Sequence, residues 1–315
     1  MSANLAQALG VDISKATLDV HLHPGGATAR FANDGKGFTA LIKWLARFAP
    51  VRIVYEPTGA CHRAFERRLL AAGFSLAKVN PRQARRFAEA IGANAKTDAV
   101  DAAMLARFGA MVAPRALTAS SQALDEMRDL QVARRALIKD RTAAQNRAHV
   151  RDLPLLKAQA ADRLKQIARQ IAAIDAALRA RRDADPALKA RFDILVSIPG
   201  LGEVTALALL VEMPELGERD NKCAASLAGL APMARDSGQW KGKRFIRGGR
   251  AEARCALYMP ALVAARFNPD LKAKYQALID AGKAPKLAII AVMRKLVILA
   301  NALLRKGMTW TPKPA

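Results

Sequence analysis

Four acidic residues in the first third of the chain could together hold a divalent metal ion. Asp12 lies near the end of an apolar run (QALGVDI), and Glu56 directly follows the run VRIVY. Asp98 and Asp101 are three residues apart in KTDAVDA, a spacing that places both on one face of a helix. Clustered carboxylates repel one another unless a cation neutralises them, and hard oxygen ligands favour Mg²⁺, with Mn²⁺ as the alternative. Such a metal ion can polarise a phosphodiester and stabilise its entering and leaving oxygens.

Taken singly, each of these acids has a plainer interpretation. An Asp at a strand end often caps a turn, and an Asp in the first turn of a helix complements the helix dipole. The metal hypothesis depends on all four acids arriving at one place. Asp19 and Asp34 lack such a placement, and we expect them to be surface residues.

A second group of reactive residues surrounds Ser237. Residues 232–250 contain several Gly and Pro residues and predict a loop. A serine hydroxyl becomes a nucleophile when a base removes its proton, and clustered Arg and Lys suit the charge that develops on an attacked phosphate. The alternative is a flexible basic loop that clamps a nucleic-acid backbone, with Ser237 as a turn residue. The basic residues of this segment are Arg235, Lys241, Lys243, Arg244, Arg247 and Arg250.

The charge of the whole chain also favours a polyanionic partner. It carries 51 Lys and Arg against 27 Asp and Glu, a net charge of +24, and each neutralised phosphate adds affinity by releasing counterions. Gly200 and Gly202, in the segment IPGLGEV, are typical of a helix-hairpin-helix element whose backbone amides contact a phosphate. A turn between two packed helices would look the same. Three arginines that follow Pro81 add a basic helix: Arg82, Arg85 and Arg86.

The elements that would position the four acids form a mixed α/β domain over residues 1–114. Residues 7–13 and 17–23 predict a β-hairpin, with a third strand near residues 29–32. Apolar residues at helical spacing follow between 38 and 48, and VRIVY predicts a buried central strand. A helix, a strand at 74–79 and the basic helix from Pro81 complete the domain. Three antiparallel strands followed by alternating helix and strand is the order of the RNase H-like fold.

Two further domains are predicted beyond residue 114. Residues 115–190 lack Gly over most of their length, and residues 164–178 carry apolar side chains at the alternating spacing of a coiled coil. Pro154 predicts a break between two antiparallel helices. Gly and Pro return from about residue 191, which predicts a mostly helical C-terminal domain over residues 191–315. The fold class is therefore α/β plus α.

Cysteine usage and hydropathy bear on the compartment. Three scattered cysteines form no CxxC pair and suit a reducing cytoplasm rather than a zinc site. The N-terminus lacks the pattern of a signal peptide. The apolar stretch 287–304 is interrupted by Arg294 and Lys295, and the stretch 195–213 contains Pro, Gly and Glu, so we expect neither to span a membrane.

The order of these motifs resembles one family across nearly the whole chain. The motifs are GVDISK, YEPTG, NPRQARRFA, KTDAVDA, the helical stretch, IPGLG and SGQWKGKR followed by GG. They are similar to the DEDD transposases of the insertion-sequence 110 family, which are related to Piv-type DNA invertases and act as bridge-RNA-guided recombinases. The resemblance implies that Asp12, Glu56, Asp98 and Asp101 are the metal ligands of a RuvC-like domain and that Ser237 is the nucleophile of a C-terminal transposase domain.

The same resemblance implies the partners. They are donor and target double-stranded DNA, a structured guide RNA that pairs with both, and further copies of this chain in a dimer of dimers, in the bacterial cytoplasm at the nucleoid. One alternative is a RuvC-like structure-selective nuclease in which metal-activated water cuts DNA and the serine is incidental. The other is a nucleic-acid-binding protein without catalysis.

Overall fold

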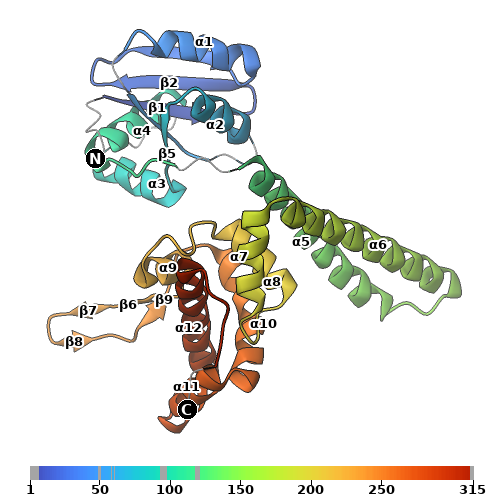
Figure 1. Ribbon diagram of the computed structural model, residues 1–315. Helices are drawn as coiled ribbons and strands as arrows, with labels where there is room; N and C mark the ends of the chain where they lie inside the picture. Colours follow the sequence, from blue (N-terminus) through green and yellow to red (C-terminus); the bar gives the residue numbers. More distant parts are fainter. Residues whose placement is uncertain are drawn as a thin grey trace. The chain divides into compact units, whose positions relative to one another are not determined.

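The chain divides into two compact units. In the computed structural model, unit 1 spans Met1–Ser120 and unit 2 spans Ser121–Ala315 (Figure 1). The structure describes residues 7–48, 51–57, 59, 61–92, 98–117 and 121–312, without the side chains of residues 98 and 99. The predicted helical segment 115–190 lies, apart from its first residues, in the same unit as the C-terminal helices.

Unit 1 is built on a five-stranded mixed sheet of order β3-β2-β1-β4-β5. The pairs β1–β2 and β2–β3 are antiparallel, whereas β1–β4 and β4–β5 are parallel. The predicted hairpin, third strand, central strand and fifth strand are all confirmed. The strands are β1 (Gln7–Ile13), β2 (Thr17–His23), β3 (Thr28–Ala32), β4 (Val51–Tyr55) and β5 (Ser75–Lys78).

Helices cover both faces of this sheet. On one face, Leu9, Val11 and Ile53 pack with apolar residues of α1 (Gly35–Leu45) and α2 (His62–Ala71) in a single core. On the other face, Val54 of β4 packs with residues of α3 (Pro81–Ala90) and α4 (Asp98–Val112). Strands covered on both faces read as near-continuous apolar runs, and this is why VRIVY could be recognised as a central strand.

Unit 2 begins with two long antiparallel helices that extend from the rest of the unit (Figure 1). They are α5 (Gln122–Ala148) and α6 (Pro154–Ala184), so the predicted break at Pro154 is confirmed. Ile167 and Ile171 of α6 are buried with Ala144 of α5, which confirms the apolar seam predicted from their spacing.

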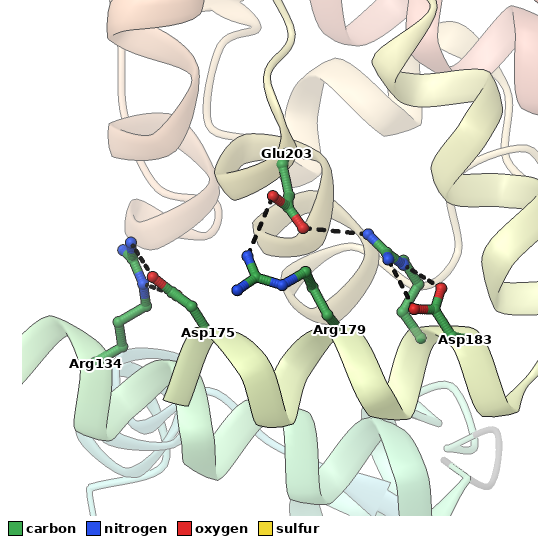
Figure 2. Close-up of polar contacts among 6 residues, drawn as sticks. Arg134, Asp175, Arg179, Asp183 and Glu203 are labelled. Atoms are coloured by element: carbon green, nitrogen blue, oxygen red, sulfur yellow. Dashed lines mark hydrogen bonds and ion pairs between the residues drawn. The ribbon is translucent and has the colours of Figure 1, made fainter. Parts of the chain in front are cut away.

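Ion pairs fix this helical pair internally and to the helices that follow. Arg134 of α5 donates to Asp175 of α6 through Nε at 2.6 Å. Glu203, the first residue of α8 (Glu203–Glu212), accepts from Arg182 at 3.2 Å and from Arg179 at 3.5 Å (Figure 2). The start of α8, which the sequence suggested as a phosphate contact, therefore faces α6 through its first side chain.

The remaining helices enclose one large apolar core. Val292, Leu296 and Val297 of α12 are fully buried at its centre. By length and hydropathy α12 is the one helix of the described residues that could cross a membrane, yet this unit uses it as a core helix. The other helices are α7 (Pro186–Val196), α9 (Asn221–Leu227), α10 (Ala251–Phe267), α11 (Pro269–Asp280) and α12 (Pro285–Lys306).

The predicted loop around Ser237 is instead a β-arm, here called the serine arm, residues 232–247. Its base pairs β6 (Pro232–Met233) with β9 (Phe245–Ile246), and its tip pairs β7 (Asp236–Ser237) with β8 (Trp240–Lys241). The arm projects from the helices of its unit (Figure 1). The loop prediction was wrong because Gly and Pro were counted as breakers, whereas here they supply the turn and the base of a hairpin.

Candidate active site

Asp12 and Glu56 lie next to each other at the carboxyl ends of two parallel strands. Val11 of β1 is in register with Tyr55 of β4, so the residues that directly follow them, Asp12 and Glu56, lie at the same end of two adjacent strands. Because side chains alternate along a strand, both acids point away from the Leu9–Val11 face and toward α4. Both residues are partly buried.

Helix α4 crosses β1 at unusually close range. Gly10 lies so near α4 that a Cβ placed on it would be 1.9 Å from the carbonyl oxygen of Ala102 and 2.4 Å from the nitrogen of Ala106. Further along the helix, a Cβ on Gly109 would be 2.9 Å from the Cβ of Ala8. Ala8 of β1 therefore lies beside Gly109 of α4, whereas Gly10, two residues further along β1, lies beside Ala102 and Ala106, which are earlier in α4. The helix is antiparallel to the strand.

This direction brings the N-terminal end of α4 to Asp12. From Gly10 to Asp12 the strand rises by about 6.6 Å, and a helix covers the same length in four to five residues. The position on α4 that faces Asp12 is then its first turn, where Asp98 and Asp101 occur. Asp101 is partly buried, whereas the side chain of Asp98, and the whole of its expected cap Thr97, lie outside the described residues.

The backbone therefore brings three parts of the predicted metal site to one end of the sheet, without showing a formed metal site. Among the side chains that the structure describes, no three His, Cys, Asp or Glu groups are close enough to hold an ion. The donor set is nevertheless of the right chemistry, because carboxylate oxygens are the ligands that Mg²⁺ prefers. Asp98, the fourth ligand expected from sequence, is not among the described side chains.

Asp19 is a further carboxylate of this site region that the sequence interpretation placed wrongly. It is directly opposite Asp12 in the β1–β2 pair, so both side chains lie on the α4 face. Only 8% of Asp19 is exposed, which corrects its expected surface position. Its Oδ1 accepts from Nε of Arg30, its own cross-strand neighbour, at 2.7 Å. The hairpin register would have revealed this placement, since residues 12 and 19 are equidistant from the turn.

Asp34, by contrast, is exposed and caps α1 as expected of a surface residue.

A polar cluster behind β4 holds the strand end that carries Glu56. Glu66 of α2 accepts hydrogen bonds from the Tyr55 hydroxyl and, at 2.8 Å, from Nζ of Lys78. Burial tends to raise the pKa of Glu66, but the bonds from Lys78 and Tyr55 outweigh it and hold the pKa below its ordinary value. Burial and the contact with Glu66 raise the pKa of Tyr55, so its hydroxyl stays a donor.

Asn33 ties together the two segments that follow Asp12 and Glu56. Its side-chain amide donates to the carbonyl of Ser14 at 2.7 Å and to the carbonyl of Cys61 at 3.2 Å. Ser14 belongs to the turn after β1, and Cys61 immediately precedes α2. The two chain segments that leave the acids are thus joined by one side chain, which sequence reasoning had not singled out.

Ser237 lies at the tip of the serine arm in unit 2. It is the last residue of β7, is exposed, and pairs with Trp240 across a two-residue turn of Gly238 and Gln239. Gly238 adopts a positive φ of 56°, as a tight hairpin turn of this type requires. The hydroxyl is therefore presented to solvent on a short ladder rather than held in a pocket.

The basic residues of this segment divide into two groups. Lys241, Lys243, Arg244 and Arg247 are exposed on the arm. Arg250 is instead half-buried at its base, where it pairs with Glu215 and also donates to a backbone carbonyl. This contact gives Arg250 a structural role, whereas its contact with nucleic acid stays a prediction.

The remaining predicted phosphate contacts are also placed. Arg82, Arg85 and Arg86 are exposed on α3, with Arg85 near Glu89 at 3.3 Å. Gly200 packs on α10, since a Cβ there would meet backbone atoms at 2.9 Å, so its small size serves helix packing. Gly202, the N-cap residue of α8, is exposed with open space around it. The segment is the turn between α7 and α8, an arrangement shared by a helix-hairpin-helix element and by a plain turn between packed helices, so its phosphate contact stays a prediction.

Two family models match the chain. Residues 9–151 match a DEDD-type IS110 model described as "Transposase", and residues 192–276 match one described as "Transposase IS116/IS110/IS902 family". The chain is 29% identical over 316 residues to the "Pilin gene-inverting protein" of Moraxella lacunata, covering 95% of this chain and 96% of that protein. The Moraxella bovis protein of the same name matches equally well. An IS900 "uncharacterized 42 kDa protein" of Mycobacterium paratuberculosis is 30% identical over 165 residues, 49% of this chain and 40% of that protein.

Proposed function

The chain belongs to the IS110 family of transposases, enzymes that cleave and rejoin DNA, and from this premise we propose that it acts through a carboxylate-bound metal and a serine nucleophile. One observation carries the first half of the proposal. The register of β1 and β4 makes Asp12 and Glu56 neighbours beneath the first turn of α4, the turn that contains Asp98 and Asp101.

Unit 1 is, in this proposal, a RuvC-like domain of the RNase H type. The sheet order β3-β2-β1-β4-β5, with antiparallel pairs followed by parallel ones, supports it. The four acids would hold Mg²⁺, or Mn²⁺ in its place, which when bound supplies a Lewis acid for a phosphodiester. The residues of the chain itself would orient that phosphate: Asp12 and Glu56 from the sheet edge, and Asp101 from the helix above it.

Ser237 is, in this proposal, the nucleophile. Its Oγ forms a bond to phosphorus, one bridging P–O bond of the DNA breaks, and the departing sugar hydroxyl takes the proton. The product is a phosphoserine ester, which conserves the bond energy for rejoining. The exposed position of Ser237 on a basic arm supports this role, because a DNA backbone can approach it without displacing a core. The "gene-inverting" relatives have a name that implies cutting and rejoining of DNA.

Partners follow from the same premise. We propose donor and target double-stranded DNA as substrates, a structured RNA as guide, and a dimer of dimers in which the acids of one copy act with the serine of another. The bacterial cytoplasm would be the compartment. The exposed Arg82, Arg85 and Arg86 support a nucleic-acid contact on α3, read through backbone and shape.

Two variants test the chemistry directly. Wild-type protein incubated with Mg²⁺, the candidate RNA and end-labelled DNA from the element should yield a covalent protein–DNA adduct on denaturing gels. Ser237→Ala should abolish the adduct, while Ser226→Ala, at an exposed serine of α9, should leave it intact. Asp101→Asn should abolish cleavage, and Asp280→Asn on α11 should not.

The outcomes separate the competing functions. Cleavage by Ser237→Ala with free DNA ends would establish the metal-dependent nuclease and refute the serine mechanism. Unchanged cleavage by Asp101→Asn would refute the carboxylate site. If none of the proteins cuts DNA in the presence of metal and RNA, the chain binds nucleic acid without catalysis. Mixing Ser237→Ala with Asp101→Asn should restore adduct formation if the two sites act between copies.

A further inference from the structure

The serine arm has two faces of different character. Ser237 and Trp240 are cross-strand partners in β7–β8, so their side chains lie on the same face, with Cβ atoms about 5 Å apart. Asp236 and Lys241 form the neighbouring pair and therefore occupy the opposite face. There Asp236 accepts from Nη1 of Arg244 at 2.8 Å. The hydroxyl of Ser237 thus shares its face with an indole ring rather than with the acid next to it.

The indole of Trp240 is held in place but not buried. A Cβ on Gly242 would lie 2.6 Å from Cη2 of Trp240, so the ring rests against this glycine and would be displaced by any larger residue. Even so, 60% of Trp240 is exposed. The ring therefore lies against the backbone at Gly242 while most of the side chain stays open to solvent, and an incoming base could stack on it.

Folding gives no account of this exposed ring. The chain has three tryptophans, all among the described residues. Trp44 packs edge-on against Phe31 and beside Phe48, and Trp310 packs against the core of unit 2. Trp240 joins none of the hydrophobic clusters of the described residues, although it is a side chain that normally contributes heavily to a core or an interface.

The charge of the arm indicates what the ring meets. The arm carries five basic residues and a single acid, Asp236, a charge balance that suits a phosphate backbone. Proteins that bind unpaired or distorted strands combine such a basic track with aromatic rings on which bases stack. Aromatic or apolar wedges can also unstack a base step at the site where DNA is bent. The basic residues are Arg235, Lys241, Lys243, Arg244 and Arg247.

We propose that Trp240 stacks on a nucleobase of the DNA strand whose phosphate lies at Ser237, and that it thereby positions that phosphate. The occupant is a base of the DNA flanking the cleaved bond, one or two nucleotide steps of about 3.4 Å from the phosphate. Trp240 is a positioning residue in this account, because it acts on the reacting phosphate through the base. The proposal deepens the function proposed above and rests on it for the role of Ser237.

Binding is tested without cleavage in full-length Ser237→Ala protein. The probe is a duplex from the end of the element with 2-aminopurine placed in turn at each position around the cleaved bond. Protein with Trp240 should raise or quench the fluorescence of one position adjacent to the bond, by stacking. Adding Trp240→Ala should remove that change and weaken binding about 10-fold to 100-fold, from the usual strength of a base–aromatic stack. Trp240→Phe should retain most of the fluorescence change and most of the affinity. Tyr258→Ala, which removes another exposed ring on α10, should change neither the fluorescence nor the affinity.

The reaction is then measured with an intact Ser237. Trp240→Ala should lower the rate of adduct formation at saturating DNA, and Trp240→Phe should restore it, a pattern that a loss of folding would not give. Equal 2-aminopurine signals and equal adduct rates with and without the indole would overturn the proposal. A signal seen only in labelled RNA would also overturn it, since the ring would then contact the guide. If the Ser237 adduct is never formed but the DNA signal depends on Trp240, the contact stands and the serine mechanism alone fails.

Discussion

Replacing Gly10 by alanine should separate α4 from β1 and with it the first turn of α4 from Asp12. The added Cβ would lie 1.9 Å from the carbonyl oxygen of Ala102, whereas ordinary contacts begin near 3.4 Å. The atoms it meets are backbone, which no side-chain rotation can move aside. Helix α4 must therefore withdraw by about 1.5 Å at this point.

Two effects of different size follow from that shift. Overpacking of this kind costs about 1–3 kcal/mol of the free energy of unfolding, which a domain of this size can survive. A displacement of about 1 Å in a catalytic group costs on the order of 100-fold in rate. Since Asp101 directly precedes Ala102, we expect cleavage to fall about 100-fold while unit 1 remains folded.

The assay pairs Mg²⁺-dependent cleavage with thermal unfolding for each variant. Gly109→Ala is the matched control, because its Cβ would press on side chains of the same sheet face, at 2.6 Å from Cγ2 of Val54 on β4 and 2.9 Å from Cβ of Ala8 on β1, about two turns from Asp101. Gly109→Ala should lower the unfolding temperature by an amount comparable to that of Gly10→Ala, but it should reduce cleavage less. If Gly10→Ala cuts within about threefold of wild type, the inference that this crossing sets the distance between Asp12 and Asp101 is refuted.

Three further predictions concern folding. Because the pKa of Glu66 lies below its ordinary 4.5, its bond to Lys78 stabilises fully above about pH 4.5 and is lost as pH falls below it. Glu66→Gln should therefore lower the melting temperature at pH 7 and reduce the loss of melting temperature that the wild type shows as pH falls below about 4.5. Gly200→Ala, at φ 104° and against the backbone of α10, should cost unit 2 about 2 kcal/mol or more in denaturant titrations. Asp34→Ala, which removes the cap bond to Gly37, should cost about 1 kcal/mol by the same measurement.

The sequence predicted most of the sheet and the ends at which its acids lie. Strands such as VRIVY are covered on both faces, and this leaves a continuous apolar run that is visible without neighbours. Pro81 and Pro154 each begin a helix, so the helix boundaries there could also be read locally. In these cases the signal and the structure it specifies lie within the same few residues.

What the sequence did not predict depends on partners far along the chain. From the sequence, Arg250 was predicted as one more basic residue of a loop. In the structure it pairs with Glu215, which is 35 residues away in the chain. The sequence predicted Gly200 only as a phosphate contact, whereas in the structure its small size also lets α10 pack against it. Asp19 was predicted at the surface for a different reason. The alternation of side chains in its strand could be seen in the sequence, but its burial follows from the hairpin register and from the helix that covers this face of the sheet.

Like charges on adjacent strands make the stability of unit 1 depend on what neutralises them. Asp12 and Asp19 are directly opposite each other in the β1–β2 pair, and like charges so placed destabilise a sheet; Glu56 follows the adjacent strand β4. Among the groups that offset these charges, Arg30 lies 2.7 Å from Asp19, and a helix N-terminus such as that of α4 adds about 0.3–1 kcal/mol. A divalent cation that binds only the folded unit would add about 2.7 kcal/mol at 100 times its dissociation constant. Metal binding and folding of unit 1 are then linked, so a Mg²⁺-dependent rise in its unfolding temperature, lost in Asp12→Asn, reports the carboxylate site independently of any cleavage.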